Sequence, residues 1–337
     1  MNAPRTALVT GASGYVGGLL VPKLLDAGYA VRVLTRSGDL DAAWADQVDV
    51  HQGDASEEDD LRSALSGVDV AYYLIHSMDG GGDFVGRDRE MAQGFADAAA
   101  AASVSRIVYL SGLHPEGKLS THLASRVEVG QILLDSGVPT AVLQAATVIG
   151  AGSVSFEMLR YLTTRLPAMI APQWLNNRIQ PVGIDDVLHW LIAAADLPSE
   201  VSRTFDIGGP DVLTYREMMQ AFAKETGQRP RLIFTLPVMT PWLASHWVGV
   251  VTPVDAGVAK PLVGSLVHEV VCREHDLTAM VGEPDGGVTP YREAVRRAMD
   301  GVENDPAHAT AIAGGLALAA GSVVLGVWLA VRRHRRS

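Results

Sequence analysis

The stretch that decides the fold is residues 6–17, which read TALVTGASGYVG. An apolar strand pattern runs directly into glycines at positions 11, 14 and 17, and a helical pattern begins at Tyr15. Glycines at this spacing permit a tight turn, let backbone amides approach a pyrophosphate and let the helix pack closely on the sheet. The helix N-terminus then directs its partial positive charge at the phosphates. We therefore predict a dinucleotide-binding loop made of Gly11, Ala12, Ser13, Gly14, Tyr15, Val16 and Gly17.

The pattern of residues 1–150 repeats this unit as an alternation of strands and helices. Helical patterns lie at Tyr15–Ala27, Leu61–Leu65, Phe84–Ala102 and His122–Leu134. Near-continuous apolar runs, typical of buried parallel strands, occur at Ala7–Thr10, Ala30–Leu34, Val48–His51, Val68–Ile75, Arg106–Leu110 and Thr140–Gln144. The alternation predicts an α/β fold with a doubly wound parallel sheet, covered by helices on both faces.

Residues 151–300 have a looser pattern, which we assign to a small substrate-binding or lid region. Within it, residues 179–210 are expected to return strands to the dinucleotide-binding domain. Thr214 and Glu217 have the spacing of a capping box at the start of a helix. Further elements are expected as helices at Phe156–Leu166, Asp185–Ala195 and Thr214–Thr226, and as a strand at Thr204–Ile207.

Residues Ile233–Val254 form an uncharged run that contains prolines at 237, 241 and 253. Proline interrupts a straight helix, so this run is interpreted as an apolar pocket wall or lid. The alternative is a patch that lies on a membrane, with Trp242 and Trp247 at the interface.

The C-terminal residues predict a membrane anchor. Residues 301–308 are interpreted as a linker, and residues 309–331 read ATAIAGGLALAAGSVVLGVWLAV without a charge before RRHRRS. About 20 apolar residues span the hydrocarbon core of a bilayer. The segment is therefore predicted to be a transmembrane helix, with a buried C-terminal helix as the alternative.

The composition limits the partners and the compartment. The net charge is −11 and the only dense basic run is the terminal RRHRR, which argues against nucleic acid as a partner. Cys272 is the only cysteine, which excludes an internal disulfide and fits a reducing compartment. The N-terminus does not resemble a signal peptide. We therefore expect a protein of the cell membrane whose main domain faces the cytoplasm.

The end of the second predicted strand indicates which dinucleotide is bound. A NAD-binding protein places an acidic residue there, on the ribose. Here Arg36 and Ser37 occupy that position, where a guanidinium and a hydroxyl can bind a 2′-phosphate. The expected cofactor is NADP, with NAD as the alternative.

Several of these segments resemble the short-chain dehydrogenase/reductase superfamily, in its extended and atypical branches. TGASGYVG at residues 10–17 has that superfamily's loop spacing. By this resemblance, Asp54 contacts the adenine, and DVAYYL at residues 69–74 forms the strand beside the cofactor. QPVGIDDV at 180–187 and FDIGG at 205–209 resemble landmarks of the extended branch.

The resemblance covers roughly residues 5–300. Within it, YYLIHSM at 72–78 and SFEMLRYLTTRLP at 155–167 resemble a bacterial subgroup of NAD(P)-binding proteins. That subgroup is akin to the Rossmann-type accessory subunit of respiratory complex I.

The superfamily's active site combines a serine after the fifth strand with Tyr-x-x-x-Lys on the next helix. In this sequence Ser111 follows the fifth strand, and His122 and Arg126 stand at the tyrosine and lysine positions. Their i, i+4 spacing places both side chains on one helix face. Ser111, His122 and Arg126 are therefore the candidate catalytic residues.

The two replacements change the expected chemistry. Arg126 can bind ribose hydroxyls and keep a positive charge beside the site. Histidine has an ordinary pKa of about 6.5, and an arginine next to His122 would lower its pKa. A neutral imidazole is a plausible general base at pH 7 but a poor general acid. Catalysis by this pair and mere positioning of the cofactor both remain open.

No metal site is expected. His268, Glu269 and Cys272 nearly match a zinc-protease helix motif, but the cysteine replaces its second histidine.

Two functions fit these residues. The first is an atypical NAD(P)-dependent oxidoreductase or isomerase that acts on a small apolar substrate at the membrane. The second is a catalytically inactive, membrane-anchored NADPH sensor or assembly factor. Small residues at 317, 321 and 326 also suit helix packing into a homo-oligomer.

Overall fold

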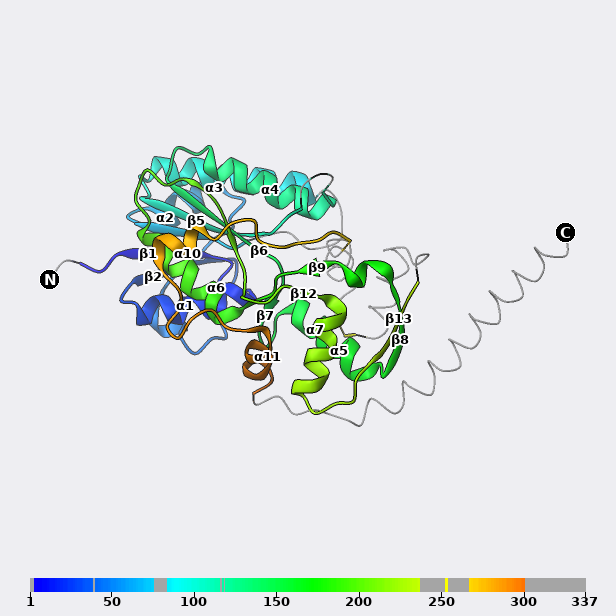
Figure 1. The fold of residues 1–337 in the computed structure, drawn as a ribbon. Coiled ribbons are helices and arrows are strands. Elements are labelled where there is room, and N and C mark those ends of the chain that lie inside the picture. The colour runs from blue at the N-terminus through cyan, green and yellow to red at the C-terminus, as the bar shows by residue number, and fades with distance from the viewer. Residues whose placement is uncertain are drawn as a thin grey trace.

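A seven-stranded parallel sheet organises the first of two lobes (Figure 1). The computed structural model describes residues 3–38, 40–75, 84–115, 117, 119–236, 252–253 and 267–300. The sheet strands are β1 (Thr6–Thr10), β2 (Ala30–Thr35), β3 (Asp49–Gln52), β4 (Val70–Tyr73), β5 (Arg106–Gly112), β6 (Thr140–Ala145) and β11 (Arg203–Ile207). Their order is β11-β6-β5-β4-β1-β2-β3, and every pairing is parallel. The predicted α/β fold with a doubly wound parallel sheet is confirmed.

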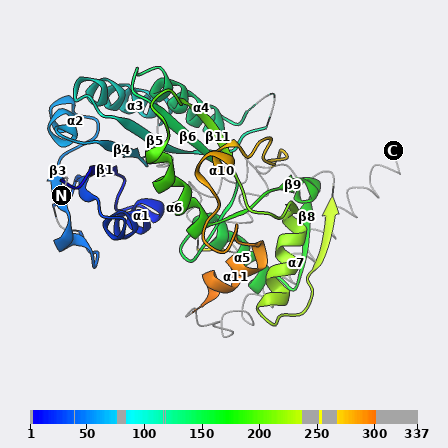
Figure 2. The same ribbon diagram turned by 60° about the vertical axis from the view of Figure 1, so that its left-hand side comes forward.

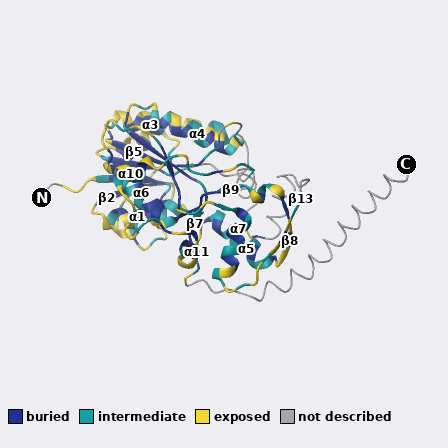
Figure 3. Ribbon diagram, in the orientation of Figure 1, coloured by how far each residue is buried: buried dark blue, intermediate teal, exposed yellow. Residues whose placement is uncertain are grey.

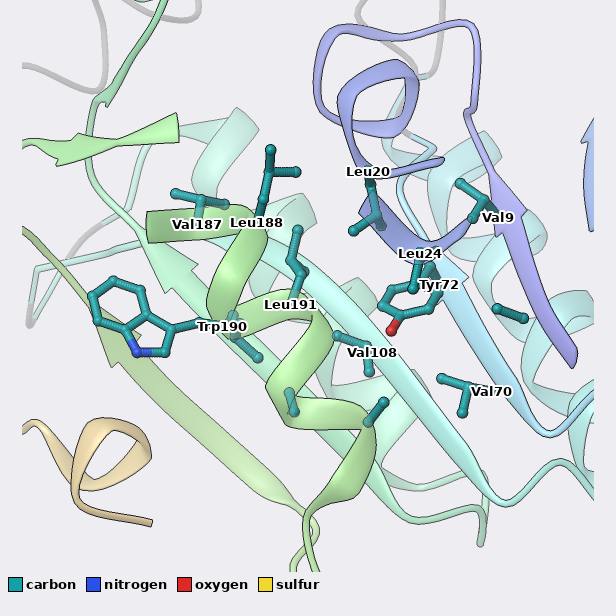
Figure 4. Packing of buried hydrophobic residues seen from close by; sticks show 14 of the residues in the cluster. Val9, Leu20, Leu24, Val70, Tyr72, Val108, Val187, Leu188, Trp190 and Leu191 are labelled. Carbon is teal, nitrogen blue, oxygen red and sulfur yellow. The ribbon is translucent and has the colours of Figure 1, made fainter. Parts of the chain in front are cut away.

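One face of the sheet is covered by α1 (Tyr15–Asp26) and α6 (Ile184–Ala193). Leu20 and Leu24 of α1 and Leu191 of α6 pack against strand residues such as Val9 and Tyr72 (Figure 4). A short helix, α10 (Asp276–Val281), contacts α6 and β11 on the same side. All these apolar side chains are buried, which explains why the strands read as continuous apolar runs.

The opposite face is covered by α2 (Glu58–Leu65), α3 (Phe84–Ala101) and α4 (Thr121–Leu134). Phe95 of α3 packs edge-on against Tyr73, with ring centroids 4.9 Å apart. The Ser120 hydroxyl accepts a hydrogen bond from the Leu123 amide and so caps α4. The start of α4 is thereby fixed one residue before His122.

The second lobe is built from α5 (Val154–Arg165), α7 (Tyr215–Glu225) and α11 (Tyr291–Met299), which share a separate apolar core (Figures 2 and 3). Thr214 and Glu217 form the predicted capping box at the start of α7. The remaining described strands form three two-stranded ladders, which pair β7 (Val148–Ile149) with β10 (Val182–Gly183), β9 (Arg178–Ile179) with β12 (Leu213–Thr214), and β8 (Ala168–Pro172) with β13 (Leu232–Leu236). Short 3-10 helices occur at η1 (Ala45–Gln47), η2 (Gln173–Asn176) and η3 (Ala194–Asp196).

The uncharged run from residue 233 to residue 254 is described only at its start and at residues 252 and 253. Its described start lies in β13, where Ile233 is buried in the core and Phe234 is exposed. Residues 233–235 are not among the described residues that line the candidate site presented below. Residues 237–251 lie outside the described part of the chain.

Within the described residues, no helix is long and apolar enough to cross a membrane. The predicted linker at 301–308 and the predicted transmembrane helix at 309–331 lie outside those residues.

Candidate functional site

The glycine loop closes the carboxyl end of β1 onto the start of α1. Gly11 has a φ of +75°, and a Cβ atom there would lie 2.7 Å from the Leu74 carbonyl oxygen. A Cβ at Gly17 would lie 2.2 Å from the Gly11 carbonyl oxygen. Glycine is therefore required at both positions for the turn and for close packing of the helix. This is the geometry that the spacing predicts for a pyrophosphate-binding loop.

One cavity of about 800 Å³ extends from this loop along the ends of β2 and β3. We call it the β2 cavity. Among the predicted cofactor-binding residues, it brings together Gly11, Ala12, Ser13, Arg36, Ser37 and Asp54. Trp44 and Asp41 also line it, and the sequence analysis missed both. Its position beside the glycine loop suits the adenosine half of a dinucleotide.

Asp54 is held as an anion at the edge of the β2 cavity. The backbone amide and the hydroxyl of Ser56 donate hydrogen bonds of 2.9 and 2.8 Å to its Oδ1 atom. These hydrogen bonds lower the pKa of Asp54 below its ordinary value. The carboxylate can therefore accept hydrogen bonds from a cofactor without first losing a proton.

A second cavity of about 310 Å³ lies on the other side of the glycine loop, between the two lobes. We call it the interlobe cavity. Among the predicted site residues, it brings together Gly11, Gly14, Tyr15, Val16, Gly17, Ser111, His122 and Arg126. The candidate catalytic residues thus share one cavity with the loop that would hold the pyrophosphate.

The rest of the interlobe cavity is mainly apolar. Its second-lobe wall comes from Met158 on α5, Tyr215 on α7, Ile179 on β9 and Val270. Among the described residues that line it there is no Asp, Glu or Lys. These wall residues could not be predicted from local sequence patterns, because they come from elements that are far apart along the chain.

Arg126 is anchored within the protein. Its guanidinium donates a hydrogen bond to the carbonyl oxygen of Leu110, and its central carbon lies 5.6 Å from the centre of the Tyr109 ring. The hydroxyl of Ser111 donates a 3.4 Å hydrogen bond to the backbone carbonyl of Arg126. β5 and α4 are therefore joined at the point where Ser111 and Arg126 enter the cavity.

His122 is neutral at pH 7. Burial and then the positive charge of Arg126 lower its pKa to about 4, while Asp88 acts in the opposite direction. Asp88 is itself buried and accepts a 3.1 Å hydrogen bond from the Ser125 hydroxyl. The effect of Arg126 on this pKa was predicted from the sequence, whereas the larger effect of burial was not.

Tyr15 connects the glycine loop to the second lobe. Two of its ring carbons lie 3.6 Å from the position that a Cβ atom would occupy at Gly152, which comes just before α5. Its hydroxyl is buried and has no hydrogen-bond partner among the described residues. Burial, and then the charges of Asp185 and Glu157, raise the pKa of this hydroxyl well above its ordinary value. The tyrosine therefore remains protonated.

The near match to a zinc-protease motif does not form a metal site in the described residues. The Glu269 carboxylate forms an ion pair with Arg178, with 3.0 Å between Nη2 and Oε2. Burial raises the pKa of the Cys272 thiol to about 12, which disfavours the thiolate. No group of three or more His, Cys, Asp or Glu side chains in the described residues could hold a metal ion.

Comparisons with known proteins agree with this geometry. The model of the NmrA-like family matches residues 4–237. Ceramide reductase of Caulobacter vibrioides is 27% identical over 247 residues, which cover 69% of this chain and 74% of that protein.

Two solved structures share the fold. Triphenylmethane reductase of Citrobacter sp., complexed with NADP(H), has a TM-score of 0.70 at 18% identity, covering 87% of this chain and 99% of that one. An NADPH-dependent quinone oxidoreductase of Escherichia coli has a TM-score of 0.68 at 20% identity, covering 86% and 98%. The family match and the two cavities beside the glycine loop confirm the predicted nicotinamide dinucleotide cofactor. The chain belongs to the NmrA-like family, within the extended short-chain dehydrogenases/reductases that bind NAD(P) on a Rossmann-type sheet.

Proposed function

We propose that the protein is an NADP(H)-dependent oxidoreductase that acts on a small apolar carbonyl or alcohol. The observation that carries this proposal is the interlobe cavity, where Ser111, His122 and Arg126 meet the glycine loop inside an apolar wall. When bound there, the cofactor supplies or accepts a hydride at its nicotinamide ring. The residues of the chain orient the substrate and move a proton.

The preference for NADPH over NADH is part of the proposal. Arg36 and Ser37 both line the β2 cavity at the end of β2, where an NAD-binding protein carries an acid. A guanidinium binds a phosphate with two parallel hydrogen bonds, and the hydroxyl can add a third.

Each candidate catalytic residue has a distinct role in this proposal. Arg126 keeps a positive charge beside the reacting oxygen and stabilises negative charge that develops there. The Ser111 hydroxyl can donate a hydrogen bond to the same oxygen. His122, with a pKa of about 4, is neutral and can accept a proton from an alcohol or from a carbon next to a carbonyl. The arrangement therefore favours alcohol oxidation or isomerisation over a reduction that needs a strong general acid.

The substrate class follows from the cavity wall. Met158, Ile179 and Val270 present apolar surface, and the part of the lining that the structure describes contains no carboxylate or ammonium side chain. The similarity to a ceramide reductase supports an apolar substrate, as does the shared fold of the quinone and triphenylmethane reductases. Turnover of NADPH or NADP should be measured with a panel of long-chain ketones, long-chain alcohols, quinones and triphenylmethane dyes. Tight cofactor binding without turnover of any panel member would contradict the enzyme proposal.

The second candidate function is an NADPH-binding sensor or assembly factor. The observations that favour it are the missing tyrosine and lysine and the hydrogen bond that ties Arg126 to Leu110. A protein of this kind binds NADPH and changes its partners without turnover. Pull-down experiments with and without NADPH, on the His122→Ala variant as well as the wild type, separate the two functions.

The proposed location is the cytoplasmic face of the cell membrane, held there by residues 309–331. The terminal arginines would then have to cross the bilayer, against the positive-inside rule. Exporting the whole NADPH-binding part of the chain is harder than passing a few residues, and a helix along the inner leaflet would avoid the conflict. Fractionation should find the full chain in membranes and a truncation after Asp305 in the supernatant. A full-length protein in the supernatant without detergent would contradict the anchor.

A further inference from the structure

We propose that the outer face of the β8–β13 ladder docks on an anionic lipid bilayer. This inference deepens the proposed membrane location, because it assigns a membrane contact to the folded second lobe in addition to residues 309–331. The docking surface consists of Ala168 and Ile170 on β8 and Leu232 and Phe234 on β13.

The ladder has two faces of the same apolar character. In the parallel register Leu232 pairs with Ala168 and Phe234 pairs with Ile170, so the four side chains share one face. Leu232 is 60% exposed, Phe234 is 62% exposed and Ile170 is 46% exposed. A sheet face that is exposed to water normally carries polar side chains opposite its buried face.

The other face of the ladder already has its partner. Met169, Ala171 and Ile233 alternate with the exposed residues and are buried in the core of the second lobe. That core includes Phe156 of α5 and Phe222 of α7. The exposed side chains are therefore not needed to hold the ladder on its lobe. Figure 3 shows exposed residues along β8 and β13.

The charged residues that flank β8 and β13 in the sequence are positive. Arg165 precedes β8, and Arg229 and Arg231 precede β13 at the same end of the ladder. No Asp or Glu occurs in residues 158–184 or 226–254, although the whole chain has a net charge of −11. Arg229 is exposed and has no hydrogen bond or ion pair in the described part of the chain. Arginines at one end of an exposed apolar face complement anionic headgroups above an acyl layer.

The same charges disfavour a second copy of the chain as the occupant. A symmetric dimer through this face would place each surface against the same surface of its partner. When the twofold axis runs along the strands, the arginine-bearing ends of the two ladders meet, and like charges in an interface weaken association. The sequence after β13 also stays free of charge until Asp255, which is compatible with a bilayer nearby.

The test is a fluorescent label at the docking surface of the full-length chain. Cys272→Ser removes the native thiol, and Phe234→Cys then carries an environment-sensitive nitrobenzoxadiazole label. The matched control is the same label at Met280→Cys, because Met280 is 47% exposed but lies on α10 against the sheet lobe. Both proteins keep residues 309–331, so any binding through that segment is the same for both. NADPH binding by each labelled protein shows that it is folded.

We expect vesicles of phosphatidylcholine with phosphatidylglycerol to shift the emission of the label at 234 to the blue, and acyl-brominated lipid to quench it. The label at 280 should show neither change. Arg229→Glu should reduce the shift at 234, and Lys23→Glu on α1 should leave it unchanged. Vesicles of phosphatidylcholine alone should give a smaller shift.

Three outcomes would overturn the proposal. One is the absence of a shift at 234, and the second is an equal shift at 234 and 280. The third is a blue-shifted label at 234 without vesicles that depends on protein concentration, which would indicate a second copy of the chain. Failure of the proposed enzyme activity is distinguishable from these outcomes, because the label reports on the bilayer whether or not a substrate is turned over.

Discussion

The hydroxyl oxygen of Tyr15 lies 2.1 Å from the position that a Cβ atom would occupy at Gly150. Tyr15 belongs to the glycine loop, whereas Gly150 leads into the second lobe. The two lobes therefore meet through a contact that leaves no room for a side chain at residue 150. The side chain of Ile184 restricts the same space, with its Cγ2 atom 2.6 Å from that position.

Gly150→Ala should destabilise the protein and weaken NADPH binding. The added methyl group has to displace Tyr15, and overpacking of this kind costs about 1–3 kcal/mol. Chemical denaturation and calorimetric titration with NADPH measure the two effects. Tyr15→Phe serves as the control, because its hydroxyl has no hydrogen-bond partner in the described residues and its removal should leave stability unchanged or improved. The double variant should recover part of the loss, and full additivity of the two changes would contradict the contact.

Arg36→Asp should erase or reverse a preference for NADPH over NADH. The variant removes a charge-assisted contact to the 2′-phosphate and introduces repulsion, so the NADPH affinity should fall by about tenfold or more. Calorimetry with both cofactors gives the ratio directly. Arg62→Asp is the matched control, because Arg62 is exposed on α2 and does not line the β2 cavity. Equal affinities for NADPH and NADH in the wild-type protein would refute the assignment.

His122→Ala should abolish turnover while leaving NADPH affinity nearly intact, whereas Arg126→Ala should weaken both. The difference follows from the proposed roles, in which His122 moves a proton and Arg126 also binds the ribose. Because the pKa of His122 is about 4, its protonation should not limit the rate between about pH 5.5 and 8. Steady-state kinetics across this range with the best panel substrate check the prediction. Unchanged turnover in the His122 variant would remove this residue from the mechanism.

The low pKa of His122 should also affect stability. The folded-state pKa of about 4 lies below the ordinary value of 6.5, so between these values the unfolded chain binds more protons than the folded chain. Stability from this group is fully present above 6.5 and is lost as the pH falls towards 4. The wild type should therefore lose roughly 1–2 kcal/mol more than His122→Gln between pH 7 and pH 5. Urea unfolding at both pH values measures the difference, with His51→Gln on β3 as a control, and equal losses in all three proteins would contradict the burial of His122.

The sequence was sufficient for the sheet because its signals are local. The strands predicted in the first 150 residues match those observed to within about two residues, since buried parallel strands are continuous apolar runs. The glycine loop and the facing positions of His122 and Arg126 also follow from short-range spacing. The helix that contains Leu61–Leu65 begins earlier, at Glu58, because its first turn is acidic rather than apolar.

The second lobe depends on contacts that are distant in sequence. The segment Ala168–Pro172 follows Pro167 and ends in a proline, and no strand was predicted there, yet it pairs with Leu232–Leu236 as a parallel strand. The cavity wall at Ile179, Tyr215 and Val270 likewise comes from three separate elements. Single-sequence periodicity contains no information on which strands pair over such distances. The exposed apolar face of the ladder was therefore not predictable, because it depends on this pairing and not only on the presence of apolar residues in the sequence.

The late position of β11 has a consequence for synthesis on the ribosome. β11 occupies the edge of the sheet next to β6, but it follows α5 and α6 in the chain. From the time that Ala145 leaves the exit tunnel until Ile207 follows it, the outer edge of β6 has no partner strand. Unpaired strand edges of this kind recruit other chains and promote aggregation. Nascent chains stalled between these two residues should therefore be the ones most dependent on chaperones, and those stalled beyond Ile207 should be released from that dependence.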